Sequence, residues 1–142
     1  TQVTNEGFLQ LGARPEIVWL DLTATRIDEQ GMVSLNQWVS LERISLEGTR
    51  ITDLLVSRLA RLPNLLELDL SGTPITDRSL KELGRLTKLR ELWLTGTRIS
   101  DAGLLHLEPL RQLEVLNLDQ TKISDTARQR LQEKLPKLKP SP

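Results

Sequence analysis

The chain has 142 residues, a length typical of one domain, and its 19 Lys plus Arg balance 19 Asp plus Glu, so the formal net charge is zero. This balance gives no global electrostatic reason to expect nucleic acid or a membrane surface as a partner, and no apolar run reaches transmembrane length. Cysteine is absent, which excludes disulfides, thiolate metal sites and a cysteine nucleophile.

Leucines recur with a fixed period along the chain. The clearest copy, residues 86–108, reads L-T-K-L-R-E-L-W-L-T-G-T-R-I-S-D-A-G-L-L-H-L-E, and further copies of its skeleton lie one period before and one period after it. The threonine at position twelve marks the phase, because Thr25, Thr49, Thr73, Thr97 and Thr121 fall 24 apart without slippage. Five full repeats follow from this phase: 14–37, 38–61, 62–85, 86–109 and 110–133.

Both ends of the chain differ from these repeats. Counting back from Thr25 places Thr1 at position twelve, so residues 1–13 are interpreted as a half-repeat, which is either a helical cap or the product of a cut through a longer array. Residues 134–142 are predicted to form a C-terminal cap and tail, because Arg128 replaces an apolar residue and prolines end regular structure. The last helix is expected to extend through Leu131 and Leu135.

Each repeat is predicted to contain a short strand and a short helix. The alternation in Leu68-x-Leu70 indicates a strand, and the three-residue spacing of Leu80 and Leu83 indicates a helix. A Thr or Ser followed by Asp can cap that helix, and the Asp suits its N-terminal dipole. Glycines at position eleven permit a tight turn after the strand, where the threonine hydroxyls are expected to satisfy buried backbone groups.

The skeleton L-x-x-L-x-x-L-x-L-x-x-T-x-I-T/S-D-x-x-L-x-x-L resembles bacterial leucine-rich-repeat proteins. It is most similar to the ribonuclease-inhibitor-like and cysteine-containing subclasses, although Thr replaces the cysteine at position twelve and the period of 24 is shorter than is usual in both. The resemblance implies an α/β leucine-rich-repeat solenoid, with a parallel sheet on the concave face and short helices on the convex face. It also implies a protein-binding scaffold whose concave sheet carries the contacts.

The residues between the strand leucines are expected to face solvent on the concave sheet, at positions six, eight and ten of each repeat. These rows hold six carboxylates and one arginine, so the face is predicted to be acidic. Trp19 and Trp93 stand out as candidate contact residues, because exposed Trp is enriched among interface hot spots; each could also lie flat over its neighbours and bind nothing. Trp38 is interpreted as a wedge at a loop. The predicted partner-binding residues are Trp19, Asp21, Arg43, Glu67, Asp69, Glu91, Trp93 and Asn117.

Other chemistry has weaker support. Glu67, Asp69 and Glu91 could act as acid–base or metal-binding groups, but an open sheet provides no pocket to shift a pKa, and there is no loop of alternating oxygen ligands. His106, the single histidine, has no Cys or second His to act with. A basic ridge at position thirteen could attract nucleic acid, but the acidic sheet beside it would repel phosphates. The sequence therefore predicts no enzyme, no cofactor and no metal site.

The function predicted from the sequence is non-catalytic recognition of a basic protein or peptide on the concave face, with no nucleic acid and no membrane as partner. The alternative is a structural or spacer fragment of a longer array with no partner of its own. A third reading is an accessory to an enzyme whose catalytic residues lie outside this chain. The chain is expected to be a monomer, or to self-associate weakly through its N-terminal edge.

Overall fold

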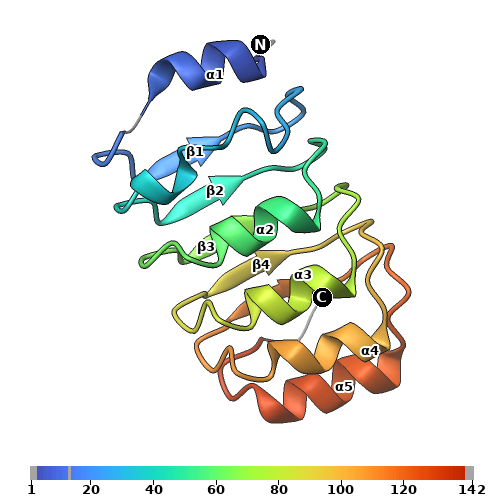
Figure 1. The fold of residues 1–142 in the computed structure, drawn as a ribbon. Coiled ribbons are helices and arrows are strands. Elements are labelled where there is room, and N and C mark those ends of the chain that lie inside the picture. Colours follow the sequence, from blue (N-terminus) through green and yellow to red (C-terminus); the bar gives the residue numbers. More distant parts are fainter. Residues whose placement is uncertain (1–2, 13, 140–142) are drawn as a thin grey trace.

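The computed structural model describes residues 3–12 and 14–139. Five short parallel strands form one sheet in chain order (Figure 1), and each pairs with the strand of the next repeat, as in Leu20↔Ile44↔Leu68. The strands are β1 (Trp19–Asp21), β2 (Arg43–Ser45), β3 (Glu67–Asp69), β4 (Glu91–Trp93) and β5 (Val115–Asn117). The predicted parallel sheet is confirmed.

Helices follow the strands in the same order. Figure 1 shows α2 to α5 stacked on one side of the sheet, and α1 beyond β1 at one end of the stack. They are α1 (Asn5–Leu11), α2 (Asp53–Leu59), α3 (Asp77–Leu83), α4 (Asp101–Leu104) and α5 (Asp125–Lys134), with 3-10 turns η1 (Leu35–Gln37) and η2 (Leu105–Leu107). Within the described part of the chain, none of these helices has the length and apolar character needed to cross a membrane.

The repeat leucines form one continuous core between the sheet and the helices. Along a strand such as β3, the central Leu68 is fully buried, whereas Glu67 and Asp69 on either side lie half-buried on the opposite face. Ile75 and the helix leucines Leu80 and Leu83 complete the same layer and are also fully buried. Burial of these side chains is what makes stacked repeats stable, because a single repeat has no second surface to cover its apolar face.

The predicted threonine ladder is confirmed. Each hydroxyl at position twelve donates a hydrogen bond to the carbonyl three residues earlier, as Thr73 Oγ1 does to Leu70 O at 2.5 Å. The same bond recurs in every repeat, from Thr25, Thr49, Thr97 and Thr121. The hydroxyls thus satisfy turn carbonyls that point toward the core, where an unpaired polar group would be costly.

The turn after each strand requires a left-handed residue. Gly48, Gly72 and Gly96 have φ of 65°, 66° and 68°, whereas Ala24 and Gln120 adopt φ of 55° at the same position in the outer repeats. A side chain in this region crowds the following carbonyl, at a cost that glycine avoids.

Replacing Gln120 by glycine is expected to raise the free energy of unfolding by about 0.5 kcal/mol, because relief of the left-handed strain outweighs the extra flexibility of the unfolded chain. The converse change, Gly96→Ala, should lower it by about 1 kcal/mol. Urea denaturation of both variants tests this expectation. A Gln120→Gly protein that is less stable than the wild type would show that the side chain stabilises the turn.

The first repeat departs from the predicted pattern. After Ile27 the chain runs through turns to η1, without an α-helix. Gly31 and the β-branched Val33 are poor helix formers. Gly31 also lies so close to Asn5 of α1 that a Cβ would overlap the Asn5 side chain. The prediction of a helix in every repeat is therefore wrong for this one, whose residues are poor helix formers and pack against α1.

The last helix is longer than the others, as predicted, but it ends at Lys134, one residue before Leu135. Arg128 of this helix donates from Nη2 to the carbonyl of Leu118 at 2.8 Å, at the end of the core. Leu135 is buried, and the amide of Lys139 donates to the carbonyl of Glu114 at 3.0 Å. Residues 135–139 therefore pack back against the last repeat.

Trp38 is a core residue. Its side chain is fully buried and stacks on Phe8 of α1, with ring centroids 5.3 Å apart. It occupies the position that Leu62, Leu86 and Leu110 hold in later repeats. Trp38 was interpreted as a wedge at a loop; it does follow η1, but its side chain lies in the core.

Candidate functional site

The predicted contact residues lie in two rows across the concave sheet. Strand register places Trp19, Arg43, Glu67 and Glu91 side by side in one row. The second row contains Asp21, Ser45, Asp69, Trp93 and Asn117. Trp19 is 64% exposed, whereas Glu67, Asp69, Glu91, Trp93 and Asn117 are half-buried. The rows therefore form one continuous face of charged, polar and tryptophan side chains.

Five of the eight predicted residues meet around one hollow of about 150 Å³ on this face. Its lining is Trp19, Arg43, Ile44, Ser45, Glu67, Asp69 and Trp93. Ser45 is the small side chain among large neighbours, which leaves space above β2. The remaining predicted residues, Asp21, Glu91 and Asn117, lie in the same rows but do not line the hollow.

Three residues of the second row also have a structural role that was not predicted. Asp21, Asp69 and Asn117 each accept a hydrogen bond at Oδ1 from the backbone amide two residues later, at 2.9, 2.8 and 2.8 Å. Such turns are typical of Asp and Asn side chains. The hydrogen bonds from the Thr23 amide and hydroxyl lower the pKa of Asp21. These side-chain turns could have been predicted from the sequence, because Asp or Asn recurs at position eight of the repeat.

Within residues 3–12 and 14–139, no basic side chain forms an ion pair with the carboxylates of the concave face. The ion pairs among the described residues are Arg85–Glu82 at 2.6 Å and Lys139–Glu114 at 3.8 Å, and neither involves Glu67, Asp69 or Glu91. In the described ranges, no three His, Cys, Asp or Glu side chains gather closely enough to hold a metal ion. The face therefore presents negative charge to solvent, with Arg43 as the cation between Trp19 and Glu67.

The basic ridge consists of the four basic residues at position thirteen, and all four are exposed: Arg26, Arg50, Arg98 and Lys122. It borders the end of the strands and does not contribute to the hollow. The acidic sheet and the basic ridge are therefore separate surfaces of the molecule. His106 is exposed in η2 among the convex helices.

A hydrogen-bonded ladder of acidic side chains joins the repeats near the helix N-termini, and sequence reasoning missed it. Asp53 accepts from the Thr76 amide at 2.8 Å, the Thr76 hydroxyl at 2.7 Å and the Ser79 hydroxyl at 2.5 Å. Glu29, Asp77 and Asp101 accept in the same way from Thr52, Ser100 and Ser124. The predicted helix caps are present at α2, α3 and α5, where for example the Arg78 amide donates to Thr76 Oγ1 at 3.4 Å, but Ser100 makes no such bond at α4. Each acceptor thus joins its repeat to the next one, and Thr52, Thr76 and Ser124 also cap a helix.

The ladder lowers the pKa of two of its carboxyl groups. Burial raises the pKa of Asp53, but hydrogen bonds from Ser79 and Thr76 outweigh this and hold it below its ordinary value. The hydroxyl and amide of Ser124, with the charge of Arg130, lower the pKa of Asp101. The ionised forms are therefore favoured in the folded state.

Acid is expected to weaken the fold through these groups. Because their pKa values are lower in the folded state than the ordinary value of 3.8, the unfolded chain binds more protons near that pH. The stabilisation is complete above 3.8 and is lost as the pH falls through the folded-state pKa values. Urea denaturation between neutral pH and about pH 3 should show a smaller loss of stability for Asp53→Asn than for the wild type. An equal loss in both proteins would contradict this assignment.

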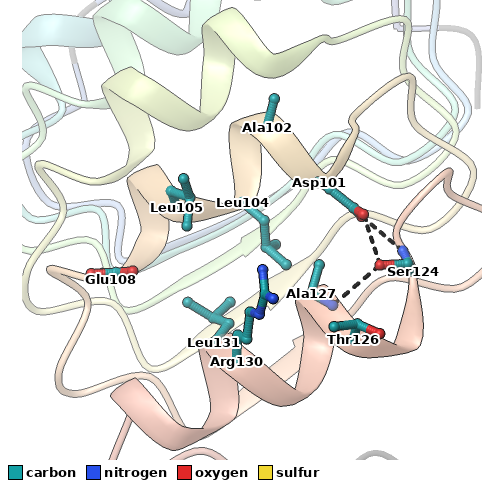
Figure 2. Close-up of a pocket in the computed structure, with 10 residues that line it drawn as sticks. All are labelled: Asp101, Ala102, Leu104, Leu105, Glu108, Ser124, Thr126, Ala127, Arg130 and Leu131. Carbon is teal, nitrogen blue, oxygen red and sulfur yellow. Dashed lines mark hydrogen bonds between the residues drawn. The ribbon is translucent and has the colours of Figure 1, made fainter.

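A larger hollow, of about 280 Å³, lies on the convex side between α4 and α5 (Figure 2) and was not predicted. Its walls include Leu104, Leu105, Ala127 and Leu131, and the Arg130 side chain extends from α5 toward α4. Leu105 is 62% exposed at its edge. No sequence signal indicated this groove, because it depends on how far α5 stands from the shorter α4.

Comparisons with known proteins agree with this geometry. Residues 63–106 match a family model described as Leucine Rich repeats (2 copies). Internalin C2 from Listeria monocytogenes is 30% identical with a TM-score of 0.65, and the match covers 78% of this chain and 46% of that chain. A leucine-rich-repeat protein from Leptospira interrogans is 28% identical with a TM-score of 0.63, and the match covers 97% of this chain and 39% of that chain. No curated protein sequence matches.

The chain therefore has the fold of a leucine-rich-repeat solenoid, as the resemblance implied. It spans less than half of the length of either solved relative. Proteins with this fold typically mediate protein–protein interaction and serve as scaffolds without catalysing reactions, so the concave face becomes the first surface to consider.

Proposed function

We propose that this solenoid is a non-catalytic recognition scaffold that binds a basic protein or peptide through its acidic concave face. The observation that carries the proposal is the meeting of two tryptophans and two unpaired carboxylates around one hollow on that face. Tryptophans at protein surfaces supply large apolar contact area, and unpaired carboxylates attract and orient a cationic partner.

In this proposal the eight predicted residues have different roles. Trp19 and Trp93 are the apolar anchors, because one is largely exposed and the other is half-buried at the opposite wall of the hollow. Glu67, Asp69 and Glu91 provide the charge that steers the partner. Arg43 lines the hollow, whereas Asp21 and Asn117 lie in the rows beyond it and also hold their own turns.

We also propose that the chain is related to the ribonuclease-inhibitor-like or cysteine-containing subclass of leucine-rich-repeat proteins, with a repeat period of 24 residues. In this proposal the chain is a single domain, made of the five repeats given above and the end segments 1–13 and 134–142. The registers of the strands, each offset by one such period, support the repeat length. A monomer suits the proposal, because the binding face needs no second copy to be complete.

Affinity capture from a native lysate tests this function. The wild type should retain a protein that the Glu67→Lys, Trp93→Ala variant does not, because the variant removes one anchor and reverses one charge at the hollow. The matched control is Glu133→Lys, Leu105→Ala, which reverses a charge and truncates a large apolar side chain at exposed positions among the convex helices. Circular dichroism melts establish that all three proteins are folded.

The structural or spacer alternative makes a different prediction in the same experiment. A spacer with no partner of its own would retain nothing selectively, or would retain the same proteins in all three forms. If only the control variant failed to retain a protein that the wild type captures, the contact surface would lie on the convex side. Either result would overturn the proposed function.

A further inference from the structure

The hollow on the concave face has the size of one side chain. Its volume is about 150 Å³, and it is open to solvent on the concave face. Large side chains surround the small Ser45, and Ile44 lies in the lining below them. A partner would therefore insert a single group here, while its other contacts spread over the rows of the sheet.

Two tryptophans line this space, one from each end. Trp19 lies beside Arg43 in strand register, and Trp93 lies beside Asp69, so the hollow extends over β2 and β3 between them. The face of an indole ring attracts a cation more strongly than other aromatic rings do. A guanidinium gains most from such a ring, because it is planar and can stack on it.

One acidic side chain of the hollow is oriented before any partner arrives. Asp69 has its Oδ1 fixed by the Ser71 amide at 2.8 Å. No described residue donates to its second oxygen, and Glu67 beside it has no ion-pair partner among the described residues. Two carboxylates against the single Arg43 leave the hollow with a negative charge, which excludes an acidic group as the favoured occupant.

We infer that the hollow receives the guanidinium group of an arginine side chain of the partner, stacked against indole and paired with Asp69 and Glu67. This inference rests on the proposed function and adds the chemistry of the partner's central contact. Arginine fits better than lysine because its planar fork can donate two parallel hydrogen bonds to a carboxylate while it stacks on a ring. The partner segment thus carries an arginine at the centre of the interface.

The probe for this inference is blocked arginine, N-acetyl-arginine-N-methylamide, titrated while the indole N–H signals are followed by NMR. The signals of Trp19 and Trp93 should shift saturably, and the fully buried Trp38 serves as an internal reference that should not shift. The blocked citrulline analogue, which has the same shape without the charge, should bind at least about fivefold more weakly. The blocked lysine analogue should bind about threefold more weakly.

Three variants test the assignment of the residues. Asp69→Asn keeps the acceptor for the Ser71 amide and should weaken arginine binding about fivefold, because it removes the charge. Arg43→Gln should strengthen binding about twofold, because it removes a like charge from the hollow. Glu47→Gln makes the same kind of change at an exposed position that does not line the hollow, and it should leave the affinity unchanged.

Several results would overturn the inference. They are citrulline or lysine binding as tightly as arginine, no saturable shift of either indole signal, an unchanged affinity in Asp69→Asn, or a weaker affinity in Arg43→Gln. None of these results depends on capture of a whole partner. Selective capture by the concave face together with a failed arginine titration would keep the proposed function and reject the arginine.

Discussion

Replacing Asp53 by alanine is expected to lower the free energy of unfolding by about 2–4 kcal/mol, because the change leaves buried donors without an acceptor. Asp53 accepts three hydrogen bonds from the next repeat, one of them from Ser79, whose side chain is fully buried. The Thr76 amide would also lose its partner at the N-terminus of α3. Urea denaturation measured by circular dichroism gives the loss directly.

The matched control for this variant is Asp125→Ala. Asp125 occupies the same position at the start of α5, but no residue in the described part of the chain donates a side-chain or backbone hydrogen bond to its carboxylate. Its removal should cost only the helix-dipole contribution, about 0.5 kcal/mol. If the two variants lost equal stability, the ladder between repeats would contribute nothing beyond that local effect.

Gly84→Ala is expected to destabilise the protein by about 2–3 kcal/mol, although alanine is the better helix former, because the added methyl group overpacks the boundary between two repeats. Gly84 lies at the end of α3 with φ of −57°, a conformation that alanine adopts freely. A Cβ there would overlap the carbonyl oxygen of His106 in the next repeat. The whole segment around η2 would have to move outward to accommodate it.

Gly7→Ala is the control for Gly84→Ala, because it changes helix propensity in the same way without overpacking a contact between repeats. Gly7 lies within α1, where a Cβ would have only an ordinary contact, 3.7 Å from Thr4 Oγ1. Alanine should therefore stabilise that helix by about 0.5–1 kcal/mol. Thermal melts of the two variants should shift in opposite directions. A Gly84→Ala protein that melts at or above the wild-type temperature would refute the close approach of the two repeats.

Much of the fold was predictable from the sequence because the constant period determines the phase of every repeat. The strand centres Leu68 and Leu92 and the turn threonines such as Thr73 lie where their position in the repeat placed them. The rows of the concave face followed from the same phase, since strands offset by one repeat bring equal positions side by side. The gathering of Trp19 and Trp93 around one hollow was not predicted, because they lie on β1 and β4.

The features that were missed depend on contacts between repeats. The role of Asp53 was interpreted within its own helix, where Asp favours the N-terminus, but its three donors come from the following repeat. In the segment after Ile27, where no α-helix forms, Gly31 lies against Asn5 of α1. The convex groove depends on the spacing of α4 and α5. A pattern within one repeat does not specify such distances.

The most direct test of the account is the affinity of the captured partner for the two double variants, measured by titration calorimetry. The account predicts that Glu67→Lys, Trp93→Ala binds at least about thirtyfold more weakly than the wild type, because loss of an interface hot spot costs about 2 kcal/mol or more. Glu133→Lys, Leu105→Ala should bind within about twofold of the wild type, since exposed changes outside an interface have small effects. If the concave variant bound as tightly as the wild type, recognition through this face would be contradicted.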